Sequence, residues 1–129
     1  MKALLLLVSA TLAGCVSSPG PKDYAAHDLS RTELHRIEQD VRGSLQNPDA
    51  LFSGLKAARS SSGELTVCGW VNLRDETREF VNYVGHRPFA VTYDHEAGTL
   101  SDFQMVRFAM IKAESPPLYH YCAQRGIPL

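Results

Sequence analysis

One segment in the middle of the chain, Glu64–Leu73, constrains the fold most strongly. Its apolar residues alternate with other residues, which is the period of a β-strand with one buried face. The residues on that face are Leu65, Val67, Val71 and Leu73. We therefore expect this segment to be one strand of a sheet whose apolar face is covered by another element.

Further strand-like segments come after it. Arg74–Glu79 is entirely polar or charged, so we expect a hairpin loop there. Pro88 should bend the returning strand or place it at an edge, because proline lacks the backbone N–H that a central strand uses. The expected strands and the turn between the last two are Phe80–Gly85, Phe89–Tyr93, Asp94–Gly98 and Leu100–Ile111. The methionines and alanine of the last segment leave a buried helix as the alternative there.

An amphipathic helix is expected before the strands. Ser30 and Glu33 have the spacing of a capping box, in which each side chain accepts a hydrogen bond from the other residue's backbone N–H. Leu29 and Leu34 stand at the positions of a hydrophobic staple. An apolar stripe then recurs at helical spacing, formed by Leu34, Ile37, Val41 and Leu45. We expect this stripe to pack on the face of the sheet that carries Leu65, Val67 and Val71.

The remaining segments connect or close the domain. Asn47–Pro48 should end the first helix and start a short helical turn, docked by Leu51, Phe52 and Leu55. Arg59–Gly63 has the composition of a loop. Near the carboxyl terminus, Ser115 can cap a short helix over Leu118–Arg125 that Gly126 closes.

These elements predict an α+β fold: an N-terminal amphipathic helix on a three- to four-stranded antiparallel meander, with a short C-terminal helix. The 129 residues are 44% hydrophobic and 21% charged, which suits one globular domain. The chain has 13 Lys and Arg against 14 Asp and Glu, so it carries no excess of positive charge. We therefore expect no nucleic-acid partner.

The first 15 residues indicate export. Lys2 precedes an apolar run, Ala3–Gly14, that is shorter than the roughly 20 residues of a membrane-spanning helix. A positive charge, a short apolar segment and small residues at its end are typical of a secretory signal peptide. We therefore expect the chain to leave the cytosol.

The segment Leu12–Cys15 resembles the lipobox of bacterial lipoproteins. The resemblance implies cleavage after Gly14 and acyl chains on Cys15, which would anchor the mature chain in a membrane. An ordinary secretory signal that happens to contain a cysteine is the alternative.

The lipobox resemblance divides the chain into a signal peptide at 1–14, a lipidated cysteine with a flexible tether at 15–28, and one domain at 29–129. Tyr24 and His27 are then solvated tether residues. Val16 after the lipidated cysteine fits sorting to the outer membrane, facing the periplasm, in a Gram-negative host.

The other two cysteines are expected to form a disulfide. Cys68 and Cys122 are an even pair in a compartment that is expected to be oxidising. Two free buried thiols are the alternative. A thiol redox role is weaker, because no Cys-x-x-Cys motif is present.

A second resemblance covers about half of the chain. Val67–Arg74 and Tyr83–Phe89 resemble a signature of small exported bacterial and phage proteins: Cys-Gly-x-Val-Asn, a turn, then Tyr-x-Gly-x-x-x-Phe. The preceding Leu45–Ala50 resembles their Leu-x-Asp-Pro-Asp-Ser segment. The resemblance implies that the protein is exported. It does not point to any particular activity.

The residues of the signature favour structural roles, with one alternative. Gly69 and Gly85 suit a close backbone approach or a bulge, and Asn72 can tie the loop backbone at the end of its strand. Ligand binding by Asn72, Arg74 and Tyr83 is the alternative.

The sequence contains no recognisable catalytic or metal-binding motif. None of the five histidines has the spacing of a metal pair, and Asp94–Glu96 has the composition of a hydrophilic turn, so we expect no metal and no cofactor. Nucleophile-elbow and phosphate-loop patterns are also absent from the sequence.

Two functional classes remain. The favoured one is a non-enzymatic, lipid-anchored envelope protein that acts as a binding, adaptor or inhibitor module, with an envelope protein or a cell-wall component as its partner. The alternative is a small envelope enzyme with a site of scattered His, Asp and Arg. A cleft that joins a carboxylate to at least two of His86, His95 and His120 would favour the enzyme.

Overall fold

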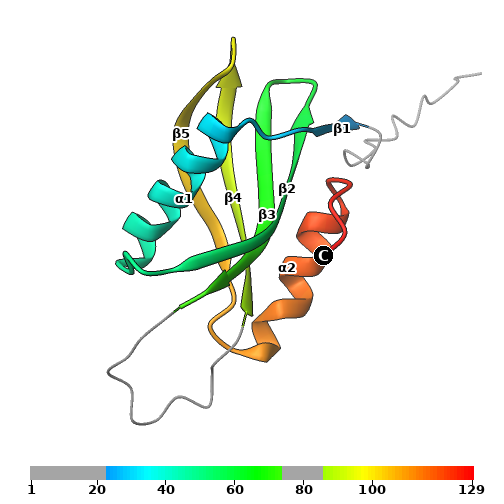
Figure 1. Cartoon of the computed structure of the whole chain (residues 1–129). Coiled ribbons are helices and arrows are strands. Elements are labelled where there is room, and N and C mark those ends of the chain that lie inside the picture. The colour runs from blue at the N-terminus through cyan, green and yellow to red at the C-terminus, as the bar shows by residue number, and fades with distance from the viewer. Residues whose placement is uncertain (1–22, 74–85) are drawn as a thin grey trace, which may run out of the picture.

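The structure, a computed structural model of the chain, describes residues 23–73 and 86–129. Five antiparallel strands form one sheet in the order β1-β2-β3-β4-β5, and two α-helices accompany it (Figure 1). The elements are β1 (Tyr24–His27), α1 (Arg31–Leu45), β2 (Leu51–Ser60), β3 (Glu64–Asn72), β4 (His86–Glu96), β5 (Thr99–Phe108), the 3₁₀ turn η2 (Lys112–Glu114) and α2 (Ser115–Ala123). The α+β class is confirmed. The signal peptide, Cys15, and the expected loop and strand over 74–85, including Arg74 and Tyr83, lie outside the described residues.

The predicted strand count of three to four is too low. The segment expected to form a helical turn around Leu51, Phe52 and Leu55 is β2, paired with β3 from Leu51 to Arg59. The register shifts between Ser53 and Lys56, and Gly54 between them has a left-handed φ of 61°. This irregularity interrupts the period-two pattern, so the apolar residues of β2 do not alternate and their spacing resembles that of a helix.

The tether predicted over 15–28 is also too long. Its residues Tyr24–His27 form β1 and pair with the carboxyl half of β2, where His27 lies opposite Ala57. Tyr24 and His27 are both partly buried rather than solvated. The pairing partner, and not the composition of the segment, makes this short stretch a strand.

Helix α1 begins as predicted. The Ser30 Oγ accepts a hydrogen bond from the Glu33 amide at 3.1 Å, and Glu33 Oε1 accepts one from the Ser30 amide at 3.0 Å. Ile37 and Val41 of its stripe are fully buried in a cluster with Leu65, Val67 and Val71. The predicted contact between the helix and that face of the sheet is therefore present.

Two further expectations are resolved. The segment after Gly98 is the strand β5, so the alternative of a buried helix is wrong. Helix α2 begins at Ser115, which is its first residue rather than the predicted side-chain cap. Pro88 lies in β4, and its carbonyl accepts a bond from the Ala109 amide, just beyond the end of β5. A backbone N–H at position 88 would therefore point toward β5 where that strand has already ended. Proline, which lacks this N–H, is tolerated there.

Candidate functional site

Three side chains from three separate elements meet near one end of the sheet. They are His27 at the end of β1, Glu33 in the first turn of α1 and His95 near the end of β4. Glu33 Oε2 lies 3.0 Å from His27 Nε2 and 3.2 Å from His95 Nε2. The two imidazole rings stand edge to face, with centroids 4.8 Å apart. We call these three residues the histidine–glutamate cluster.

Local geometry brings each member into place. The strand pairing of His27 with Ala57 holds β1 against the sheet, and only three residues separate β1 from α1. The capping box fixes the Glu33 carboxylate over the helix start. His95 belongs to β4 and not to the predicted turn, because Ala97 and Gly98 adopt left-handed φ values and close the hairpin tightly.

Glu33 is an anchored carboxylate. Burial opposes its ionisation, but the bonds from the Ser30 amide and from His27 outweigh burial and lower the pKa of Glu33 below its ordinary value. Its side chain is 11% exposed. The cluster therefore contains a fixed negative charge facing two imidazoles.

Arg59 at the end of β2 determines how the His95 ring is held. Its Nε donates to His95 Nδ1 at 3.1 Å, and a terminal guanidinium nitrogen donates to the His95 carbonyl at 3.2 Å. Because Nδ1 accepts this bond, the proton of neutral His95 is on Nε2. That atom faces Glu33 Oε2 but is not aligned for a hydrogen bond, and it has no hydrogen-bond partner in the described part of the chain.

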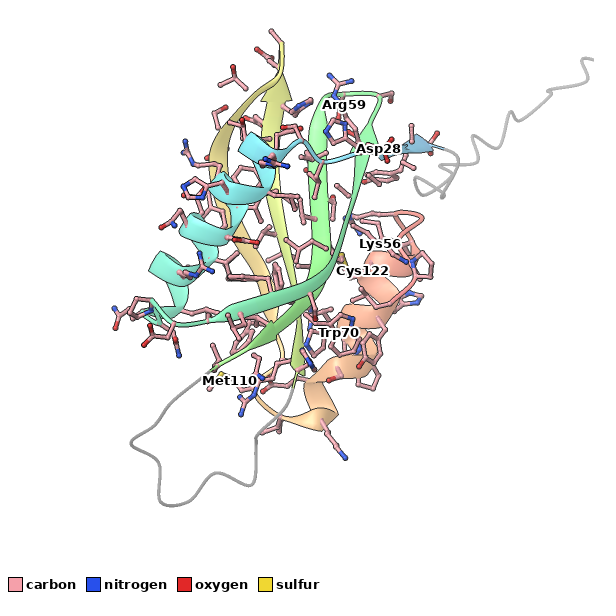
Figure 2. All side chains as sticks on the ribbon, viewed as in Figure 1. Asp28, Lys56, Arg59, Trp70, Met110 and Cys122 are labelled. Carbon is pink, nitrogen blue, oxygen red and sulfur yellow. A yellow bond between two sulfur atoms is a disulfide. The ribbon has the colours of Figure 1, made fainter. Side chains whose placement is uncertain are left out.

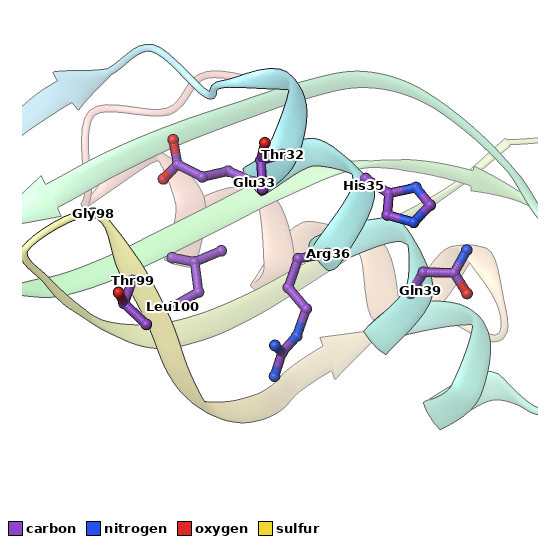
Figure 3. A pocket seen from close by; sticks show the side chains of 8 residues that line it. All are labelled: Thr32, Glu33, His35, Arg36, Gln39, Gly98, Thr99 and Leu100. Carbon is purple, nitrogen blue, oxygen red and sulfur yellow. The ribbon is translucent and has the colours of Figure 1, made fainter.

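A groove of about 560 Å³ lies beside the cluster, between α1 and the β4–β5 hairpin. Its lining includes Glu33, His35, Arg36 and Gln39 on the helix and Leu100 on the strand (Figure 3). Figure 3 shows the Glu33 carboxylate pointing away from His35 and Arg36. A catalytic centre requires polar groups that converge on one point. The polar groups of this groove do not converge in that way.

The histidines named for the enzyme alternative do not gather. His86 and His95 are nine residues apart on the same strand, which corresponds to about 30 Å. The exposed His86 contacts the Ser53 hydroxyl through Nδ1 at 3.3 Å. His120 is exposed on α2, on the other side of the sheet from α1. Among the described residues, His95 is the one of these three that lies against a carboxylate, that of Glu33, and the second histidine there is His27.

The predicted disulfide is present. Cys68 of β3 and Cys122 of α2 are bonded, with their Cα atoms 6.3 Å apart. Cys68 points away from the face of Leu65 and Val67, as strict alternation requires. Gly69 therefore marks no bulge in β3. It allows a close approach instead, since a Cβ there would lie 3.2 Å from the Leu55 Cα.

The opposite end of the sheet exposes large apolar side chains. Leu51 is 49% exposed, Met110 52% and Ile111 53%. The register places Leu51 beside Asn72 and Asn72 beside His86, while Arg87 donates to the Met110 carbonyl at 2.8 Å. We call Leu51, Met110 and Ile111 the apolar end. Figure 2 shows Met110 and Arg59 at opposite ends of the sheet.

Of the residues proposed for ligand binding, the structure places Asn72 at the apolar end, partly buried. Sequence reasoning missed the grouping of His27 with Glu33. Glu33 was identified only as a helix cap and His27 only as part of a tether. No spacing rule relates residues 27, 33 and 95, because three separate elements carry them.

Comparison of the chain with protein-family models, curated proteins and solved structures found no match. Within the described residues, neither helix is long and apolar enough to cross a membrane.

Proposed function

We propose that this chain is a lipid-anchored protein of the bacterial cell envelope that binds a protein partner and performs no catalysis itself. The observation that carries the proposal is the opposition of its two ends. Strand β1, which follows Cys15 in the chain, begins at the end of the sheet near Arg59, and the exposed apolar side chains lie at the other end.

The anchor is supported by the resemblance of Leu12–Cys15 to a lipobox. Nine residue steps separate Cys15 from Tyr24 in β1, and a fully extended chain of that length spans about 30 Å at most. Acyl chains on Cys15 would therefore keep the domain close to the bilayer. Two or more chains hold a protein far more firmly than one.

The disulfide supports an oxidising location. Structural disulfides persist in exported proteins and are rare in the bacterial cytosol. The resemblance to small exported proteins agrees with this location. In a host with two membranes, Val16 after the lipidated cysteine favours the outer membrane, with the domain facing the periplasm.

The apolar end supports a protein partner. A cluster of exposed apolar side chains often marks the centre of a protein-binding surface. A single exposed apolar side chain is common and does not indicate binding. Here three of them share one end of the sheet. That end also carries Asn72, whose partly buried amide offers a polar contact at its margin.

The enzyme alternative depended on two of His86, His95 and His120 meeting a carboxylate. The structure separates these three histidines, and the groove beside Glu33 has diverging polar groups. We therefore favour binding.

Two measurements test the anchor. Intact mass of the mature protein should correspond to a chain that starts at Cys15 and carries acyl groups. Cys15→Ser should release the protein from the membrane fraction. A chain that retains residues 1–14, or an unmodified thiol at Cys15 in a membrane-bound protein, would contradict the proposal.

Site-specific photo-crosslinking in intact envelopes tests the binding surface. A photoreactive residue in place of Met110 should give a discrete adduct, and the same residue in place of Glu96, at the other end, should not. Adding Ile111→Asp should abolish the adduct, whereas the matched change Thr99→Asp should leave it. Equal adducts from both positions, or none from Met110, would contradict the assignment of the apolar end.

A further inference from the structure

We propose that His27, Glu33 and His95 form a binding site for one divalent transition-metal ion of the Zn²⁺ type. The three ligand-type atoms lie within 4.8 Å of one another. Imidazole nitrogen and carboxylate oxygen are ordinary Zn²⁺ ligands, and two histidines with one glutamate is a known three-ligand set. The proposal is independent of the proposed partner and of the lipid anchor.

The spacing of the donor atoms suits such an ion. Zn²⁺ binds nitrogen and oxygen at about 2.0–2.2 Å, so neighbouring ligands of a tetrahedral site lie about 3.3 Å apart. Here Glu33 Oε2 lies 3.0 Å from His27 Nε2 and 3.2 Å from His95 Nε2. Small rotations of the side chains would open the centre of the cluster for the ion without moving the backbone.

The state of His95 points to a ligand in the same place. The residue is 9% exposed, and its Nε2 atom has no hydrogen-bond partner among the described residues although it faces the cluster. A buried polar atom without a partner is costly. An ion bound at Nε2 would satisfy it once the ring proton has moved to Nδ1.

Glu33 makes the site ready for a cation. Its Oε1 is held by the Ser30 amide at 3.0 Å, which leaves Oε2 facing the two histidine nitrogens. Such an outer hydrogen bond orients a ligating carboxylate. The side chain of His27 is 22% exposed, which leaves the ion a route from solvent.

Arg59 would compete with the ion. A metal at His95 Nε2 takes that atom's lone pair, so the ring must carry its proton on Nδ1 instead. Neutral His95 keeps the same number of protons, but Nδ1 can no longer accept the bond from Arg59 Nε. Arg59 is exposed and can withdraw while keeping its bond to the His95 carbonyl. Metal binding should therefore be linked to loss of the hydrogen bond from Arg59 Nε to His95 Nδ1.

The ligands come from β1, α1 and β4, so the ion would join the first strand to the rest of the domain. Three protein ligands leave a fourth position for water or an external ligand.

Titration of the full chain with Zn²⁺ tests the site, using protein purified in detergent without a histidine tag and followed by calorimetry. One equivalent should bind. His27→Ala and Glu33→Gln should each weaken binding about tenfold or more, since even outer-shell changes weaken metal sites by that factor. Gln preserves the capping-box pattern, so the helix start should remain. The matched controls His35→Ala and His120→Ala remove exposed histidines elsewhere and should leave the affinity unchanged.

Two further readouts separate a ligand role from a structural one. Co²⁺ should give the visible absorption bands of a four-coordinate site in the wild type and lose them in His27→Ala. Arg59→Ala should bind Zn²⁺ more tightly than the wild type, because the competing hydrogen bond is gone. The proposal is overturned by absence of saturable binding to the wild type, by equal binding to His27→Ala, or by loss of binding in His35→Ala.

Discussion

The two faces of the sheet are built differently. The face under α1 carries large side chains, among them Leu65, Phe89 and Tyr93, and they enclose Ile37 and Val41 of the helix. The face under α2 carries Ala58, Cys68 and Ala90, which meet Leu118, Cys122 and Ile127. Small side chains bury little area, and on this face a covalent bond joins the sheet to the helix.

The difference shows that one layer is held by burial and the other depends on oxidation. Burial of the apolar stripe of α1 contributes the same stabilising free energy in any compartment, because burial of aliphatic side chains does not depend on redox conditions. The layer of α2 contains fewer large apolar groups and its central contact is the disulfide. The second layer should therefore be more stable where disulfides persist than where they are reduced, which agrees with the proposed envelope location.

Removing the disulfide should have the largest effect. The bonded cysteines are 54 residues apart, and the chain-entropy model gives about 4 kcal/mol for a loop of that length. Cys68→Ala combined with Cys122→Ala should lower the free energy of unfolding by about that amount, measured by urea denaturation. Reduction of the wild type should give a similar loss. A double variant as stable as the parent would mean that α2 is held by packing alone.

Ile37→Ala should break the other face. Ile37 is fully buried between α1 and the sheet, and truncation of such a side chain costs about 2–5 kcal/mol. The loss should be the same in oxidised and reduced protein, since no disulfide lies in this layer. Arg31→Ala on the exposed side of the same helix is the control and should change stability by less than about 0.5 kcal/mol. If Arg31→Ala were the more costly change, the assigned buried face would be wrong.

Tyr93→Phe refines the comparison of the two faces, because the face under α1 also contains a side-chain hydrogen bond between the sheet and the helix. The Tyr93 hydroxyl donates to Asp40 Oδ2 at 2.9 Å, so its removal should cost about 1.5 kcal/mol at neutral pH. Burial, and then the bond to Asp40, raise the pKa of Tyr93 above its ordinary value. The neutral phenol therefore stabilises the fold below about pH 10, and this stabilisation is lost as the pH rises further.

Urea denaturation at neutral pH and near pH 11 measures both effects of Tyr93. The wild type should lose stability between the two, and Tyr93→Phe should lose less of it. An equal alkaline loss in both proteins would assign the effect to other groups.

Ser30→Ala should have the smallest effect, about 1 kcal/mol, through loss of the helix cap. Ser44→Ala, in the last turn of α1 and exposed, is the matched serine control and should not destabilise. Thermal melts of both variants check this. If Ser44→Ala lowered the stability as much as Ser30→Ala, loss of the helix cap would not be the cause of the effect at Ser30.

The features that could be predicted from the sequence are those encoded locally. The cap at Ser30, the stripe through Ile37 and the alternation of β3 each lie within one element, so period and spacing sufficed. The disulfide followed from counting cysteines once Cys15 was assigned to lipid. These features fix the α+β class and the face on which α1 packs.

The remaining features depend on partners distant in sequence. Strand β2 was mistaken for a helical turn because Gly54 and the register shift disrupt its alternation, and β1 is a strand only because β2 pairs with it. The histidine–glutamate cluster needs both errors corrected: His27 enters it through β1, and Arg59, at the end of β2, reaches His95 36 residues away. Composition carries no signal for such a grouping.

Hydrogen–deuterium exchange of the full chain, with and without reductant, tests the contrast between the two faces most directly. In oxidised protein the amides of α1, α2 and the central strands should all be protected. After reduction we expect that α2, residues Ser115–Ala123, loses protection while α1 and β3 keep theirs. Loss of protection in α1 to the same extent as in α2, or unchanged protection of α2, would contradict this contrast.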